Sequence, residues 1–382
     1  MNDTELRKIC YYDEFKCLCG ACPDNCCHGW SIPLDEEALS RFKKEKGLYG
    51  IWLRSTIHGR EQKIFSPLSI RCPHLRRDGY CDLQKKKGEA YIADVCREYP
   101  RVRMNYGPAA EFHLDLSCIH AASLFLSHLG EEELLTDSDS EDLPEQYGNN
   151  DDQEHFLNLY DHRYSLIALI RAAVEEGADV LNDALRFIAG REWLIQKDLL
   201  IKGSSDKWYS DDELDIGRDL FPLSINDINE MMSTCFYEEW LRYSEPFLYK
   251  LCRMYYKSFD RLSYKQGDEE LRSLFKKYIY HDPAAIRLMG EYVISLLLRR
   301  YLMSFEDYSP YHHFKDAYLS MNLLCLFYML WYEKKGKPEK SDISHMIAAV
   351  EKRFFHNDNV LKDVHASVRS EKAAVTGEMS GE

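Results

Sequence analysis

The chain has 382 residues, of which 45% are hydrophobic and 30% charged, and its formal net charge is −15. Such a composition is ordinary for a globular protein of two or three domains and excludes a fibrous or disordered chain. The acidic balance disfavours nonspecific nucleic-acid binding. It suits a cationic partner, although solubility alone would explain it equally well.

The charge is spread unevenly along the chain. Residues 1–128 hold 19 Lys and Arg against 17 Asp and Glu, whereas the rest of the chain holds 30 against 47. The excess of negative charge therefore belongs to the C-terminal two thirds.

Neither a secretory signal nor a membrane span is expected. The opening run MNDTELRKICYYDEFKC has no apolar stretch, so we expect a cytoplasmic protein whose thiols stay reduced. The longest weakly charged apolar run, residues 317–332, is shorter than the roughly 20 residues of a span and contains Ser320 and Asn322. We predict a buried core helix there and no membrane association.

The N-terminal region is dense in cysteine, with five cysteines in the run FKCLCGACPDNCCHGW. Single buried thiols are common, but so many within about a hundred residues of a reduced chain favour metal binding. We therefore assign eight of them as candidate metal ligands: Cys17, Cys22, Cys26, Cys27, Cys72, Cys81, Cys96 and Cys118.

The spacing of these cysteines suits ligation by a loop and by distant segments. Four residues separate Cys17 from Cys22, three more lie before Cys26, and Cys27 follows directly. Because adjacent side chains tend to point apart, Cys26 and Cys27 do not both suit one tetrahedral zinc. Three alternatives for the metal group remain open, since thiolates suit each of them. They are one four-iron cluster with some thiols unused, two separate metal sites, and zinc.

Other side chains near this pattern are less specific. Cys19 is a spare thiol, and the histidines that could substitute as ligands are His28, His74, His113 and His120. Arg97 and Arg101, beside Cys96, could bind a carboxylate or balance the charge of a cluster, or could be ordinary ion-pair residues. The Cys-x3-Cys-x2-Cys motif of radical-type adenosylmethionine enzymes is absent, because the residue three positions after Cys26 is Gly29 instead of a cysteine.

A domain boundary is expected at residues 131–154, which hold eleven acidic residues and no Lys or Arg. We predict a solvated linker there, between a cysteine-rich module at 1–130 and a helical domain at 155–361, with a flexible tail at 362–382. Helical periodicity begins at Phe156, and Gly177 and Gly190 are expected to end the first two helices.

Further helices are expected over residues 227–256, 269–280, 284–303, 314–333 and 341–355, with Ser341 as the N-cap of the last. Alternating strand patterns are scarce. The predicted fold class is therefore mainly α, with an irregular, cysteine-rich metal-binding N-terminal module followed by a helical domain.

The N-terminal region resembles the flagellin lysine-N-methylases, which share a cysteine-rich, zinc- or iron-chelating region. The resemblance rests on the runs CLCGACPDNCCHGWSIPLDEEAL, RCPHLRRDGYCDLQKKKGEAYIADVCREYPR and EFHLDLSCIHAASLFL, and covers about residues 15–128. The matching residues are Cys17, Cys22, Cys26, Cys27, Gly29, Trp30, Cys72, Pro73, Leu75, Gly79, Cys81, Cys96, Tyr99, Pro100, Arg101, Ser117 and Cys118. Cys19 and the pair Ile119-His120 depart from the pattern.

The resemblance implies transfer of a methyl group from S-adenosylmethionine to lysine side chains of flagellin by a protein with a 4Fe-4S cluster or zinc. It names no catalytic or adenosylmethionine-binding residue, and no convincing glycine-rich loop is present, since Gly47-Leu48-Tyr49-Gly50 is too generic. Two alternatives stay open: a non-catalytic iron- or zinc-binding module fused to a helical interaction domain, and a redox protein. The sequence gives no oligomeric state.

Overall fold

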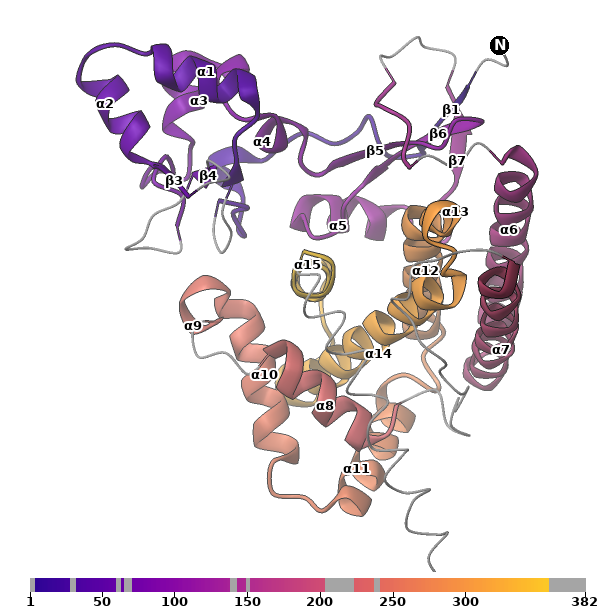
Figure 1. Ribbon diagram of the computed structural model, residues 1–382. Helices are drawn as coiled ribbons and strands as arrows, with labels where there is room; N and C mark the ends of the chain where they lie inside the picture. Colours follow the sequence, from indigo (N-terminus) through magenta and orange to yellow (C-terminus); the bar gives the residue numbers. More distant parts are fainter. Residues whose placement is uncertain are drawn as a thin grey trace, which may run out of the picture.

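The structure, a computed structural model, describes residues 4–27, 32–59, 63–64, 71–137, 143–148, 152–202, 223–236 and 241–356. The predicted tail at 362–382, and the candidates His28, Gly29 and Trp30, lie outside these residues. Helices make up most of the described chain, so the predicted mainly α class is confirmed (Figure 1).

Two small sheets occupy the N-terminal half. The first consists of β1 (Glu5–Ile9), β5 (Arg101–Asn105), β6 (Ala109–Leu114) and β7 (Leu134–Thr136), in the order β5-β6-β1-β7. Strand β1 runs parallel to β6, and the other pairs are antiparallel. Every residue of β6 is buried, including the polar Glu111 and His113, so the alternation of polar and apolar residues in this strand does not mark an exposed face.

A cysteine-rich lobe, which we define as the described residues between 16 and 98, has a hydrophobic core of its own. Its sheet is β2 (Ile32–Pro33), β4 (Lys63–Ile64) and β3 (Ile57–His58), in that order. Its helices are α1 (Glu36–Lys44), α2 (Gly47–Ser55), α3 (Asp82–Lys87) and α4 (Asp94–Glu98), with short turns η1 (Cys19–Ala21) and η2 (Glu89–Tyr91). The core contains Ile32, Ala38, Phe42, Leu53, Ile64, Leu83, Ile92 and Ala93.

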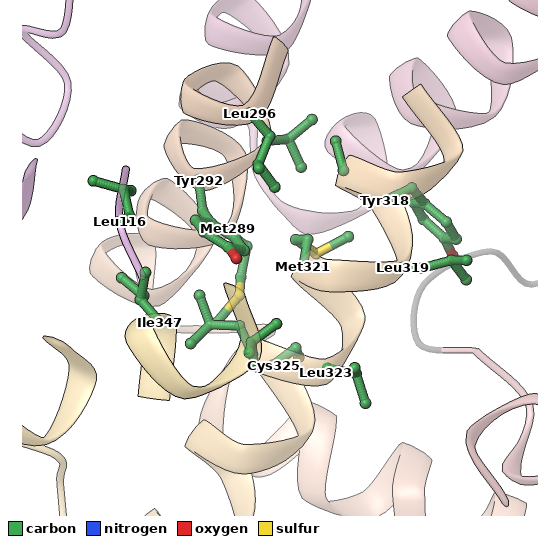
Figure 2. Packing of buried hydrophobic residues seen from close by; sticks show 14 of the residues in the cluster. Leu116, Met289, Tyr292, Leu296, Tyr318, Leu319, Met321, Leu323, Cys325 and Ile347 are labelled. Atoms are coloured by element: carbon green, nitrogen blue, oxygen red, sulfur yellow. The ribbon is translucent and has the colours of Figure 1, made fainter. Parts of the chain in front are cut away.

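The remaining helices form the body of the protein. They are α5 (Ile119–Ser127), α6 (Gln153–Glu176), α7 (Ala178–Lys202), α8 (Ile225–Phe236), α9 (Leu241–Ser244), α10 (Pro246–Phe259), α11 (Tyr264–Tyr278), α12 (Pro283–Arg300), η3 (Tyr301–Met303), α13 (Ser304–Asp307), α14 (Pro310–Lys335) and α15 (Lys340–Phe355). Helix α14 packs against α7, α10, α11, α12 and α15. Figure 2 shows Met289 and Tyr292 of α12 and Met321 and Cys325 of α14 in the buried region where these two helices pack.

The four-stranded sheet and α5 share one continuous core with these helices, whereas the cysteine-rich lobe has a separate core. The boundary between the two hydrophobic cores therefore does not coincide with residue 130, where the division into domains is predicted. The apolar run 317–332 lies in the buried middle of α14, as predicted. Within the described chain, we find no helix that is long and apolar enough to cross a membrane.

Most helix predictions are confirmed, and the exceptions have local causes. Gly177, with a φ of 112°, ends α6 as expected, but α7 continues through Gly190 because its neighbours Ile188 and Ala189 are buried in the core. The helix predicted over 227–256 is wrong as a single element, since Pro246 starts a new helix after α8 and α9. The last helix is capped by Glu339 instead of Ser341.

The start of the predicted acidic linker belongs to the sheet. Residues Leu134–Thr136 form β7 and pair with β1. Just before them, the Glu132 carboxylate is buried, where it accepts hydrogen bonds from Tyr11 and from Ser295 of α12. This segment therefore connects the first strand with the helical body, and the division into domains at residues 131–154 stays a prediction.

One buried ion pair joins the sheet to the helices. Arg163 of α6 donates to both carboxylate oxygens of Glu111 in β6, at 2.6 and 2.8 Å, and to the carbonyl of Leu298 at 3.0 Å. Both charged side chains are fully buried. Burial alone would raise the pKa of Glu111, but Arg163 holds that pKa at about 2.

The substitution Arg163→Met should lower the free energy of unfolding by about 3–5 kcal/mol, because it leaves the Glu111 carboxylate buried without its partner. Chemical denaturation at neutral pH measures this change. Arg287→Met is the matched control, since Arg287 pairs with Glu175 at the surface and its loss should cost no more than about 1 kcal/mol. Equal effects of the two substitutions would contradict this account of the pair.

Candidate functional site

A cavity of about 380 Å³ lies between the cysteine-rich lobe and the start of α5. Its walls contain all eight predicted ligand cysteines together with the spare Cys19: Cys17, Cys19, Cys22, Cys26, Cys27, Cys72, Cys81, Cys96 and Cys118. Thiols separated by up to a hundred residues of sequence therefore face one space. We call it the thiol cavity.

The first cysteine segment is shaped by local hydrogen bonds. Cys19 has a φ of +48°, unusual for a residue other than glycine, and its backbone N–H lies 3.4 Å from the Cys17 sulfur. Further along, the side chain of Asn25 accepts from the backbone N–H of Cys27 at 2.9 Å and donates to the carbonyl of Gly79 at 3.3 Å. Asn25 thus joins this segment to the second one.

Glycine at two positions lets these segments touch. A Cβ at Gly79 would lie 3.0 Å from the Cα of Gly20, and a Cβ at Gly20 would lie 2.8 Å from the carbonyl of Asp78. Gly79 also has a φ of +79°, which favours glycine. Side chains at either position would force the two cysteine segments apart.

Backbone contacts place the remaining cysteines. The backbone N–H of Cys72 donates to the carbonyl of Cys27 at 2.8 Å, which fixes the second segment against the first. Cys81 caps α3, Cys96 lies within α4, and Cys118 caps α5. These three positions bring side chains from separate helices to the same cavity.

The surroundings shift the pKa values of several cavity thiols, upward for Cys72, Cys96 and Cys118 and downward for Cys26. Burial raises the pKa of Cys72 to about 11 and that of Cys118 to about 12, and neighbouring cysteines add to both shifts. Burial also raises the pKa of Cys96. A hydrogen bond from Cys27 lowers the pKa of Cys26 to about 7, with a smaller contribution from the ammonium of Lys352.

The donor set fits a thiophilic metal group. Soft sulfur ligands crowd one cavity, and their thiolates repel one another unless a cation balances their charge. In the described part of the chain, however, no three His, Cys, Asp or Glu side chains converge closely enough to hold a metal ion. The eight ligands and the choice between 4Fe-4S and zinc therefore stay predictions.

The candidate histidines differ in their surroundings. His74 lines the cavity but is buried, which lowers its pKa to about 4, and its Nε2 lies 3.3 Å from the hydroxyl of Thr56. His120 also lines the cavity, with its ring near Phe15. His113 lies instead in β6, beside the buried Glu111. Only His74 and His120 of the described candidates therefore face the thiols.

The last helix of the body contacts the cysteine segment, a feature that sequence reasoning missed. Lys352 of α15 forms an ion pair with Asp24, between Cys22 and Cys26. Four residues later, Nε2 of His356 lies 3.1 Å from the carboxylate of Asp115. The charge pattern of an amphipathic helix gives no indication of partners more than 200 residues away.

Comparison with known proteins gives partial support to the family resemblance. No family model and no solved structure matches the chain. A stretch of 136 residues, 33% of the chain, is 26% identical to the flagellar biosynthetic protein FliU of Salmonella muenchen and covers 80% of it. The chain is also 28% identical over 136 residues to the lysine-N-methylases of Salmonella typhimurium and Salmonella choleraesuis. The match spans about a third of each methylase, 34% of its length. At this identity and coverage, the chain is similar over one region to a flagellar biosynthetic protein and to two lysine-N-methylases.

Removal of a cavity thiol should release metal. We expect Cys22→Ala and Cys26→Ala to lose bound metal and to lower the melting temperature, because each removes a predicted ligand of a structural site. Elemental analysis of the anaerobically purified full chain measures the metal content. The controls are Cys325→Ala, in the core of α14, and Cys10→Ala, whose sulfur lies near the carbonyl of Glu131. Equal metal loss in all four variants would show that the ligand set is wrong.

The contact of His356 with Asp115 should make stability depend on pH. Burial disfavours the charged ring, but the Asp115 carboxylate outweighs it and raises the pKa of His356 above its usual value. A raised pKa in the folded state stabilises the fold fully below about pH 6.5, and this contribution disappears as the pH rises through the folded pKa.

The variant His356→Gln should therefore lose more stability at about pH 6 than at about pH 8.5. Urea unfolding of the wild type and the variant at both pH values measures the difference. His345→Gln controls for a general effect of α15, since Nδ1 of His345 lies 2.9 Å from the carbonyl of Ser341 and its ring stacks on Phe247, contacts that involve no carboxylate. A stability gap that stays constant or grows with pH would contradict the ion-pair account.

Proposed function

We propose that this protein methylates lysine side chains of flagellin, with S-adenosylmethionine as the methyl donor and a 4Fe-4S cluster or zinc in the thiol cavity. The observation that carries the proposal is the similarity to proteins named lysine-N-methylase and flagellar biosynthetic protein FliU. The convergence of the cysteine segments on one cavity supports it, because the resemblance in the sequence lies in those segments.

The chemistry needs a neutral amine in line with the methyl group. The lone pair of the lysine nitrogen attacks the methyl carbon, the bond from that carbon to sulfur breaks, and S-adenosylhomocysteine leaves. Lysine has an ordinary pKa of about 10.4, so it must first lose a proton. An apolar environment lowers that pKa, and the methylated amine gives up its extra proton to water afterwards.

The thiol cavity offers such an environment next to polar groups. Phe15, Leu18 and Val95 contribute apolar surface, and Tyr99 is an aromatic residue in the same wall. Cavities of about 300–1,000 Å³ are the usual size for small-molecule sites, and this one falls within that range. A metal group bound by the thiols would supply positive charge among them and hold the cysteine segments together.

The acidic body suits a substrate that carries lysines. Residues 129–382 hold 47 Asp and Glu against 30 Lys and Arg. Opposite charge speeds the encounter of two proteins, and this contribution weakens as salt rises. Association with flagellin should therefore be faster at low ionic strength.

Mass spectrometry of flagellin tests the reaction. Flagellin from the same organism is incubated with the anaerobically purified full chain and S-adenosylmethionine, and lysines should gain the mass of one methylene group for each methyl transferred. Incubation without S-adenosylmethionine, and with the Cys22→Ala variant, provides the controls. No mass gain with metal-loaded protein would reject the proposal.

A second candidate is a non-catalytic metal-binding module fused to a helical interaction domain. The observation that favours it is the extent of the similarity, which covers 80% of FliU but only 34% of each lysine-N-methylase. The shared region is therefore smaller than a complete methylase. Metal-loaded protein that binds flagellin but shows no affinity for S-adenosylmethionine in calorimetry would favour this candidate.

A further inference from the structure

Three long, positively charged side chains line the thiol cavity: Lys16, Arg97 and Arg101. They differ in their partners. Arg97 forms an ion pair with Asp94, one turn before it in α4, and lies 3.7 Å from Glu98. Lys16 is exposed to solvent. Arg101 is partly buried, and within the described chain no carboxylate forms an ion pair with it.

The Arg101 guanidinium is held in place without a neutralising charge. Its Nη2 donates to the carbonyl of Phe15 at 3.1 Å. Its central carbon lies 5.2 Å from the ring centre of Phe15 and 5.7 Å from that of Tyr12, and both rings are buried. Cation–π contacts at this range orient the group, and one hydrogen bond leaves most of its five N–H donors free for another acceptor.

The position of Arg101 in the chain adds rigidity. It is the first residue of β5 and pairs in register with Leu114 of β6, so its backbone belongs to the four-stranded sheet. It follows Tyr99 and Pro100, which line the same cavity. A strand of the sheet thus presents an unneutralised guanidinium to a cavity that nine thiols and several apolar side chains also line.

We infer that Arg101 binds the carboxylate at the amino-acid end of S-adenosylmethionine. The inference rests on the proposed function, which it deepens by naming a residue that binds the methyl donor. A guanidinium matches a carboxylate with two parallel N–H···O bonds, and such charged pairs are among the strongest hydrogen bonds in proteins. Arg97 is less suited, because Asp94 already neutralises it.

Calorimetric titration with two ligands tests this contact. The full chain, purified anaerobically with its metal, is titrated with S-adenosylmethionine and with its decarboxylated analogue, which lacks only the carboxylate. Arg101→Gln should weaken binding of S-adenosylmethionine roughly 10- to 100-fold, the effect of losing a charged hydrogen bond. Binding of the analogue should change little.

Two further variants keep the test decisive. Arg103→Gln is the matched control, since Arg103 lies two residues along β5, pairs with Glu98, and is not part of the cavity wall. It should bind both ligands like the wild type. If Arg101→Gln unfolds, Arg101→Lys takes its place. This variant keeps the positive charge and the cation–π contact but lacks the planar guanidinium that binds a carboxylate with two hydrogen bonds. It should therefore lose affinity only for the ligand that has a carboxylate.

The outcomes separate this inference from the proposed function. An unchanged affinity of Arg101→Gln for S-adenosylmethionine, or equal loss for both ligands, would overturn the inference alone. A lower metal content in Arg101→Gln would instead assign Arg101 to the charge balance of the metal group and would also overturn it. If the wild type binds neither ligand, the proposed function fails, and the inference fails with it.

Discussion

Nine thiols share the wall of one cavity, and the need to keep them neutral or to balance their charge with a cation is the constraint on which the cysteine-rich lobe depends. Burial and neighbouring cysteines keep Cys72, Cys96 and Cys118 protonated, so these segments meet only while their thiols are neutral or while a cation balances them. Among the described residues of the lobe, eight apolar side chains are buried in its own core. A small core of this kind commonly relies on a metal for stability. The proposed metal group would thus be a structural component of the lobe, whatever else it does.

The helical body also helps to hold the lobe. Lys352 and His356 extend from α15 to Asp24 and Asp115, and the backbone of Cys118 starts α5, which packs along α15. The cavity therefore lies where the lobe meets the body, although the two have separate hydrophobic cores. This arrangement gives a physical reason for joining a cysteine-rich region to a large helical body in one chain. The ammonium of Lys352 in α15 contributes to the lowered pKa of Cys26, so charge on this helix affects a cavity thiol.

Much of the fold could be predicted because it follows from local pattern. The helical periodicity of α6, α11, α12, α14 and α15 is visible in the sequence, and the spacing of the cysteines singled out the residues that line the cavity. The predictions failed where tertiary contacts override local preference. Gly190 stays helical because its neighbours are buried, and Leu134–Thr136 pairs with β1 despite its acidic surroundings.

Contacts between distant residues left no signal in the sequence. The roles of Lys352 and His356 depend on partners more than 200 residues away, and no spacing rule connects them. Sequence reasoning also gave Arg97 and Arg101 the same interpretation, because both stand near Cys96. The structure distinguishes them by partner, since Asp94 neutralises Arg97 whereas Arg101 contacts a carbonyl and two rings.

X-ray absorption spectroscopy of the anaerobically purified full chain, at the iron and zinc edges, would show whether the cavity thiols bind a metal. We expect a bound metal whose nearest neighbours are sulfur atoms, at about 2.3 Å for zinc thiolates. Iron–sulfur scattering together with iron–iron scattering would identify a cluster. A metal surrounded by nitrogen or oxygen, or full-length protein that folds with its thiols free of any metal, would contradict the claim that these cysteines form a metal site.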